Sequence, residues 1–141
     1  MRASRVLVVD DEADIRALID EILSEEGYEV TVAGDASEAR ISKNLSRFDL
    51  ILLDIWMPET DGISLLHEWT EAGPLDCPVV MMSGHGTVDT AVEATRLGAF
   101  DFVEKPLSLA KLLHTVERAI DSAGKASNQG RSIFPSALLP I

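Results

Sequence analysis

The sequence predicts an α/β fold in which a doubly wound, five-stranded parallel sheet has helices on both faces. Two observations predict it: five short apolar runs recur at intervals of 20 to 29 residues, and the segments between them have helical periodicity. Strands that alternate with helices at this spacing form βαβ units, whose strands are parallel. Right-handed crossovers restrict the topology, and the common order for five such strands is 2-1-3-4-5.

The expected strands are short and mostly apolar, as strands buried on both faces of a parallel sheet are. They are VLVV (6–9), VTVA (30–33), LILL (50–53), VVMM (79–82) and FDFV (100–103).

The first two expected helices are recognised by an apolar stripe and by a cap. The first has apolar residues at i, i+3, i+4, i+7 and i+8, namely Ile15, Leu18, Ile19, Ile22 and Leu23. Gly27 has the usual place of a residue that ends a helix. The second helix opens with DASE (35–38), in which an aspartate cap is followed three residues later by a glutamate.

The remaining helices are bounded by glycine and proline. The third is expected over about 63–72, before the breaker Gly73-Pro74, and the fourth over about 88–97, before Gly98. The last has Ser108 as its expected cap, and one apolar face formed by Leu109, Leu112, Leu113, Val116, Ala119 and Ile120.

Composition limits the class of protein. The length of 141 residues suits one domain, and 46% hydrophobic with 26% charged residues is typical of a globular chain. The apolar runs are too short to span a membrane, and the first twelve residues lack the features of a signal peptide. A single cysteine, Cys77, excludes an internal disulfide framework. We therefore expect a cytoplasmic protein without membrane contact.

Negative charge is concentrated in one part of the chain. The net charge is −12, yet residues 124–141 contain two basic residues and no acid, so residues 1–123 carry −14. Such an acidic surface argues against direct nucleic-acid binding, which needs lysine and arginine patches, and favours divalent cations. The Gly-, Ser- and Asn-rich segment 124–141 is expected to be a linker or a C-terminal extension toward a missing effector domain, after a domain of residues 1–123.

Polar side chains follow four of the expected strands. Asp10 and Asp11 follow the first strand, Asp54 the third, Ser83 the fourth and Lys105 the fifth. Because the carboxyl ends of parallel strands lie at the same edge of the sheet, we expect these side chains to meet in one crevice.

This combination indicates a magnesium site suited to phosphoryl transfer. Carboxylates and a hydroxyl, without a histidine or cysteine cluster, suit Mg²⁺, which prefers oxygen ligands. A cation would offset the repulsion between Asp10, Asp11 and Asp54, and Lys105 would do part of the same work. Nucleophile, charge neutraliser and hydrogen-bond donors are the parts that phosphoryl transfer needs.

The segments VLVVDDE, LLDIWMPETDG, MMSGHG and FVEKP, in this order and spacing, resemble the receiver domain of two-component response regulators. The resemblance covers roughly residues 4–121, and the ordered set is far more specific than any single segment. The strand order 2-1-3-4-5 is shared by flavodoxin-like and CheY-like folds, and CheY belongs to this family, so the order is carried over with the resemblance. The segments SGHG and AFDFVEKP are most similar to receivers of NtrC/NtrX-type sigma-54-dependent transcriptional activators.

The resemblance implies a role for each carboxylate. Asp54 would be the phosphoacceptor and would take a phosphoryl group from the phosphohistidine of a histidine kinase. Asp11 and Asp54 would ligate Mg²⁺ directly, together with the backbone carbonyl of Trp56, and Asp10 would act through water. Trp56 and His85 occupy positions that modulate loss of the phosphoryl group to water. Trp56 is expected to shield the acyl phosphate, or else to lie on the surface without such a role.

The resemblance also implies a switch. Ser83 would bond a phosphate oxygen, Lys105 would pair with the phosphoryl group, and the Lys105–Pro106 peptide bond would be cis. The ring of Phe102 would turn inward when Ser83 moves toward the phosphoryl group, although a plain core phenylalanine explains the residue equally well. The fourth helix, fifth strand and fifth helix, approximately 87–121, would be the signalling face and a homodimer interface.

The implied protein assists its own phosphorylation and dephosphorylation but is not a metabolic enzyme. Its partners would be a cognate histidine kinase and an effector, which for the most similar receivers is an ATPase with a DNA-binding domain. A receiver that acts alone through protein binding is the alternative.

Each of these residues also has a simpler interpretation, and two other protein classes use similar residues. Asp10 and Asp11 could cap the first helix, Asp54 and Ser83 could be turn residues, and Lys105 could be a surface lysine. A phosphatase of the haloacid-dehalogenase type would require a second aspartate two residues after the nucleophile, where this chain has Trp56. A flavin or nucleotide carrier would require a phosphate-binding loop after the first strand, where this chain has DDEAD.

Overall fold

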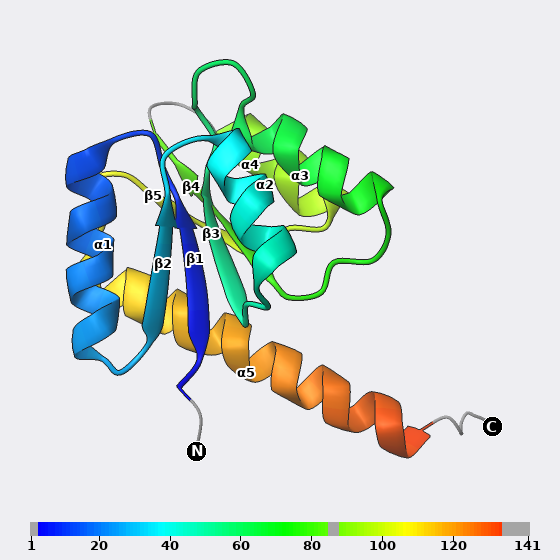
Figure 1. Cartoon of the computed structure of the whole chain (residues 1–141). Coiled ribbons are helices and arrows are strands. Elements are labelled where there is room, and N and C mark those ends of the chain that lie inside the picture. The colour runs from blue at the N-terminus through cyan, green and yellow to red at the C-terminus, as the bar shows by residue number, and fades with distance from the viewer. Residues whose placement is uncertain (1–2, 85–87, 134–141) are drawn as a thin grey trace.

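The structure, a computed structural model, describes residues 3–84 and 88–133, which form alternating strands and helices (Figure 1). The strands are β1 (Arg5–Val9), β2 (Glu29–Ala33), β3 (Leu50–Asp54), β4 (Val79–Ser83) and β5 (Asp101–Glu104). The helices are α1 (Ala13–Glu25), α2 (Ala36–Leu45), α3 (Gly62–Glu71), α4 (Val88–Leu97) and α5 (Leu109–Ile133). The neighbouring strands are all parallel and are ordered β2-β1-β3-β4-β5, which confirms the predicted fold.

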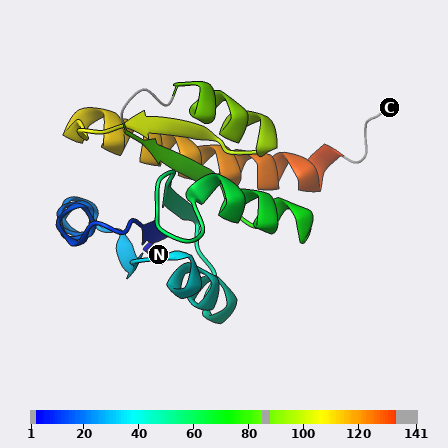
Figure 2. The same cartoon turned by 90° about the horizontal axis from the view of Figure 1, so that it is seen from above.

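The strands are apolar because both faces of the sheet are covered. Along β1, Leu7 and Val9 pack with α2 and α3 on one face, whereas Val6 and Val8 pack with α1 and α5 on the other. Figure 2, seen from above, shows helices on both sides of the sheet. Burial on two faces leaves the two rims of the sheet, where the strands begin and end, as the places for polar chemistry.

The starts of α2 and α3 have aspartate caps. Asp35 accepts a hydrogen bond from the backbone N–H of Glu38 (2.8 Å), and the Glu38 carboxylate accepts one from the backbone N–H of Gly34 (2.6 Å). The Asp35 cap is the one that DASE predicted, whereas Glu38 binds the residue before the cap and not the cap itself, as it would in a capping box. Asp61 caps α3 by accepting from the backbone N–H of Ser64 (2.8 Å).

Two glycines fix the course of the chain near helix ends. Gly27 follows α1 with a φ of +94°, a conformation that glycine adopts without strain. Gly62 begins α3 in close contact with the end of β3, since a Cβ atom there would lie 2.0 Å from the carbonyl oxygen of Asp54. The absence of a side chain at residue 62 therefore lets α3 start directly beside the backbone of Asp54.

Helix α5 is longer than the sequence predicted. The apolar stripe ends at Ile120, but the helix continues to Ile133 and extends away from the sheet (Figure 1). The expected domain boundary at 123/124 falls inside this helix, and the division of the chain there stays a prediction. Over the described residues, no helix has the length and apolar character of a membrane span.

Candidate functional site at the carboxyl edge of the sheet

The carboxyl edge of the sheet brings together the strand-end residues singled out in the sequence. Asp54 and Ser83 are the last residues of β3 and β4, and Asp10 and Lys105 directly follow β1 and β5. The backbone holds them in register: Asp10 N–H donates to the carbonyl of Ala33 (3.1 Å), and Lys105 N–H donates to that of Ser83 (2.7 Å).

Lys105 is the centre of this cluster. Its Nζ lies 2.8 Å from Asp10 Oδ2, 3.3 Å from Asp54 Oδ1 and 3.4 Å from Glu12 Oε1. Residues that are up to 95 positions apart in the chain thus share one ammonium group. The alternative interpretation of Lys105 as a surface lysine is therefore excluded. Three carboxylates around one ammonium leave an excess of negative charge.

Burial increases the effect of this excess. Asp10 and Asp54 are almost completely buried, with 0% and 3% of their surface exposed. The pKa of Asp54 is raised to about 7, chiefly by burial and next by the charge of Asp10, while the charge and hydrogen bond of Lys105 act in the opposite direction and limit the rise. Burial by itself would lower the pKa of Lys105, but its close contact with Asp10 and the charge of Asp54 raise that pKa above its usual value.

The two oxygens of Asp10 have different environments. Oδ1 accepts a hydrogen bond from the backbone N–H of Glu12 (2.8 Å). Oδ2 is buried and lies 2.8 Å from the Lys105 ammonium, but accepts no well-aligned hydrogen bond from any described residue. The N-cap of α1 is Glu12, whose side chain makes no capping hydrogen bond within the described part of the chain. Helix capping therefore does not account for the acids after β1.

The acidic residues fit a divalent cation. One carboxylate oxygen from each of three acids lies within 4.8 Å of the others, namely from Asp10, Asp11 and Glu12. Asp54 lies beside this group, because it contacts the same Lys105 ammonium as Asp10 and Glu12 do. Asp11 lies close enough to Asp54 for its charge to raise the pKa of that carboxyl. The donor set is oxygen alone, which suits Mg²⁺. The buried Asp10 Oδ2, which lacks an aligned donor, is the atom that a cation would satisfy best.

A cavity of about 440 Å³ opens over the phosphoacceptor candidate. It is lined by Glu12, Ile15, Asp54, Trp56, Gly84, Lys105 and Pro106. The side chain of Trp56 is 58% exposed at its edge, so it forms a wall of the cavity and is not part of the core. The Lys105–Pro106 peptide bond, which forms the opposite part of the lining, is cis.

The remaining predicted site residues are placed as follows. Ser83 is buried at the end of β4, and Phe102 in β5 is partly buried against the core between the sheet and α2, α3 and α4. His85 lies outside the described residues. The structure therefore brings Asp10, Asp11, Asp54 and Lys105 together, and their individual roles remain predictions.

Glu12 is the site residue that sequence reasoning missed. It belongs to the acidic run after β1, but the pattern of that run does not show which acid faces Lys105, 93 residues later. Its only sequence signal is its position two residues after Asp10, at the start of α1.

The family model described as response regulator receiver domain matches residues 6–117. The chain belongs to this family. Among curated proteins, nitrogen assimilation regulatory protein NtrX of Azorhizobium caulinodans is 43% identical over 122 residues, which are 85% of this chain and 27% of that protein. Luminescence regulatory protein LuxO of Vibrio campbellii is 38% identical, with 86% and 27% covered. This receiver domain thus spans about a quarter of the length of these relatives.

Solved structures agree with this assignment. The receiver domain of NtrX from Brucella abortus has a TM-score of 0.78 and 47% identity, over 82% of this chain and 98% of that chain. Chemotaxis protein CheY4 of Vibrio cholerae has a TM-score of 0.77 and 29% identity, over 84% of this chain and 99% of that chain. The resemblance to receivers of the NtrX type, inferred from the segments SGHG and AFDFVEKP, is confirmed.

Proposed function

We propose that this receiver domain accepts a phosphoryl group on Asp54 from the phosphohistidine of a histidine kinase. The observation that carries the proposal is the buried Asp54 carboxylate, which lies 3.3 Å from the Lys105 ammonium beside a group of acids able to hold Mg²⁺. Membership in the response regulator receiver family supports it. The proposal includes a cytoplasmic location and no direct contact with nucleic acid.

In the transfer, a carboxylate oxygen of Asp54 attacks phosphorus in line. The new O–P bond forms as the P–N bond to the kinase histidine breaks, and the bonding electron pair leaves with the imidazole nitrogen. Lys105 and the Ser83 hydroxyl offset the negative charge on the phosphoryl oxygens. Asp10, Asp11, Asp54 and the backbone carbonyl of Trp56 would hold Mg²⁺, which when bound neutralises charge on the carboxylates and the phosphoryl group.

Lys105 also keeps the nucleophile in its reactive form. Only the ionised carboxylate attacks, and burial, the largest cause of the shift, raises the pKa of Asp54. The positive charge of Lys105 lowers that pKa, and any cation bound by the neighbouring acids would lower it further.

The output is a population shift between two conformations of the face formed by α4, β5 and α5, approximately 87–121. Contacts available only in the phosphorylated form bias this equilibrium, with Ser83 and Phe102 as the moving side chains. The partner of this face is a second copy of the domain, and the effector that responds is a transcriptional activator. The names of the relatives, which are regulatory proteins several times longer than this domain, support such an effector.

Trp56 slows the loss of the phosphoryl group to water. Its ring forms a wall of the cavity over Asp54, so it restricts the line along which a water molecule can attack. Replacing it in Trp56→Ala should shorten the lifetime of phospho-Asp54, measured by loss of radiolabel. An equal or longer lifetime would contradict this role.

Labelling by acetyl phosphate in the presence of Mg²⁺ tests the nucleophile. Wild type should incorporate one phosphoryl group, and Asp54→Asn should incorporate none. Asp76→Asn is the matched control because Asp76 is an exposed aspartate at the opposite edge of the sheet. Continued labelling of Asp54→Asn would place the nucleophile elsewhere.

A further inference from the structure

Lys105 has three acidic partners, and one of them differs from the other two. The side chains of Asp10 and Asp54 are buried, with 0% and 4% of their surface exposed, whereas that of Glu12 is 61% exposed. Glu12 is the N-cap of α1, immediately before the first turn, and it lines the cavity over Asp54. It has no part in the proposed phosphoryl transfer, and its side chain makes no capping hydrogen bond among the described residues.

The buried partners of Lys105 are the carboxylates that a divalent cation would occupy. Asp10 Oδ2 and Asp54 Oδ1 are the two closest contacts of the ammonium, at 2.8 Å and 3.3 Å. A cation held by the same two side chains competes with the ammonium for their oxygens, and like charges at such short range repel. Without a third anchor, Lys105 would leave the cluster at the stage when the phosphoryl group needs it.

We propose that Glu12 is a positioning residue that retains the Lys105 ammonium at the site when a divalent cation occupies Asp10 and Asp54. The 3.4 Å contact between Glu12 Oε1 and Lys105 Nζ, on the exposed side of the cluster, is the observation that carries it. This inference rests on the proposed function, because it presumes that the acids bind Mg²⁺ and that Lys105 serves the phosphoryl group.

Glu12→Gln keeps the shape of the side chain and removes its charge. Asp14→Asn is the matched control, since Asp14 is an exposed acid of the first turn of α1, two residues after Glu12, and none of the contacts described for Lys105 involves it. Each of the two variants removes one negative charge at the start of α1. A difference between them therefore measures the contact with Lys105 and not the general field of the helix.

The position of Lys105 can be followed without any activity. The chain has four lysines, so the ¹⁵N–¹H signals of their ammonium groups are few, and Lys105→Met assigns the one from the site. Ammonium protons held in ion pairs exchange slowly enough to be observed. At saturating Mg²⁺, we expect the Lys105 signal to persist in wild type and Asp14→Asn and to disappear in Glu12→Gln. A signal that persists equally in all three would overturn the inference.

The rate of labelling by acetyl phosphate gives an independent readout. At saturating Mg²⁺, we expect Glu12→Gln to be slowed roughly two- to fivefold, the size of one partly exposed ion-pair contact. A general charge effect has the opposite sign, because removing an acid favours the approach of an anionic donor. In a Lys105→Met background, Glu12→Gln should have no further effect. A rate equal to or above that of Asp14→Asn would overturn the inference.

Failure of this inference is distinguishable from failure of the proposed function. Wild type that neither binds Mg²⁺ by calorimetry nor becomes labelled would overturn both. Wild type that does both, with Glu12→Gln indistinguishable from Asp14→Asn, would overturn only the role of Glu12.

Discussion

The two edges of the sheet differ in how their charged residues are buried and balanced. At the carboxyl edge, Asp10 and Asp54 are buried and share Lys105 with Glu12, so acids outnumber bases. At the amino edge, Arg5 is matched by acids on its neighbours: its backbone N–H donates to Asp49 (2.7 Å) and its guanidinium lies 4.0 Å from a carboxylate oxygen. Charges at this edge are partly or fully exposed, and each base has an acidic neighbour. Buried and unbalanced charge marks the site.

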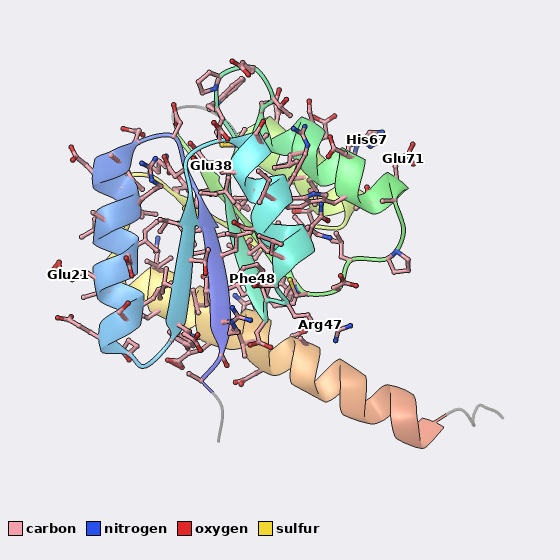
Figure 3. The ribbon with its side chains drawn as sticks, in the orientation of Figure 1. Glu21, Glu38, Arg47, Phe48, His67 and Glu71 are labelled. Carbon is pink, nitrogen blue, oxygen red and sulfur yellow. The ribbon has the colours of Figure 1, made fainter. Side chains whose placement is uncertain are left out.

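Apolar contacts complete the amino edge. The Arg5 guanidinium lies 5.5 Å from the ring centre of Phe48, which precedes β3. Figure 3 shows Phe48 near the beginning of the strands, and Glu38, at the start of α2, near the other edge. A cavity of about 460 Å³ beside Phe48 includes Cys77, and burial raises the pKa of that thiol to about 12, which keeps it protonated and unreactive. The residues described at this edge therefore contribute to packing and not to chemistry.

Removing Lys105 is expected to have the largest effect on stability. In metal-free Lys105→Met at pH 8, Asp10 remains buried without its counter-charge, and the free energy of unfolding should fall by about 2–4 kcal/mol. Arg5→Met at the amino edge should lose about 1 kcal/mol or less, because Glu29, the ion-pair partner of its guanidinium, is exposed and the backbone hydrogen bond to Asp49 is kept. Urea denaturation in EDTA measures both. Equal losses would erase the distinction between the two edges.

Replacing Asp54, the proposed phosphoacceptor, is expected to stabilise the metal-free protein. The pKa of Asp54 is about 7 in the folded protein and 3.8 ordinarily, so the folded state binds this proton more tightly. Stability from this residue is present below about pH 4 and is lost as the pH rises to about 7. Asp54→Asn removes that loss, and above pH 7 it should be more stable than wild type by about 1–3 kcal/mol.

The measurement is the free energy of unfolding of both proteins from pH 4 to pH 8 in EDTA. The difference between them should grow with pH and then level off. A constant difference would show that Asp54 titrates at its ordinary pKa.

Magnesium should compensate the excess charge at one edge only. At about ten times its dissociation constant, Mg²⁺ should stabilise wild type by about 1.4 kcal/mol, because it binds the folded state. Asp54→Asn should gain less, whereas Asp49→Asn, changed at the amino edge, should gain as much as wild type. Thermal unfolding with and without Mg²⁺ tests this. An equal gain in Asp54→Asn would place the cation away from the strand ends.

The smallest effect is expected for a balanced, exposed pair. Arg40 on α2 donates two hydrogen bonds to Glu68 on α3, at 2.8 and 2.9 Å. Because both groups are in contact with solvent, Arg40→Met should lower the free energy of unfolding less than the other destabilising variants, and less still in high salt. Its labelling by acetyl phosphate should equal that of wild type. Slower labelling would show that the link between α2 and α3 affects the site.

The sequence predicted most of the fold, because burial on two faces leaves a clear pattern. Each strand lies within a residue or so of its apolar run, and DASE predicted the cap of α2. The strand order came from the resemblance, since right-handed crossovers alone allow other orders. Helix α5 was predicted too short, because its later turns, from Gly124 on, lack an apolar stripe and contain residues of low helix propensity.

The site was predicted in outline and not in its contacts. Strand ends in a parallel sheet meet at one edge, so Asp10, Asp54 and Lys105 could be brought together from sequence order alone. The orientation of Glu12 depends on the backbone at the start of α1, where no periodicity applies. The close contact of Gly62 with Asp54 was missed for a similar reason, because an isolated glycine does not reveal what it lies against.

The length of α5 has a mechanical consequence. From Ile120 to Ile133 the helix projects by roughly 20 Å, at about 1.5 Å per residue. A rotation about its contact with β4 and β5 would therefore displace its far end more than the part that touches the sheet. If the helix is rigid, a tilt of about 10° at that contact would displace its far end by about 3 Å. Small rearrangements beside Asp54 that tilt α5 would thus become larger displacements at the far end of the helix.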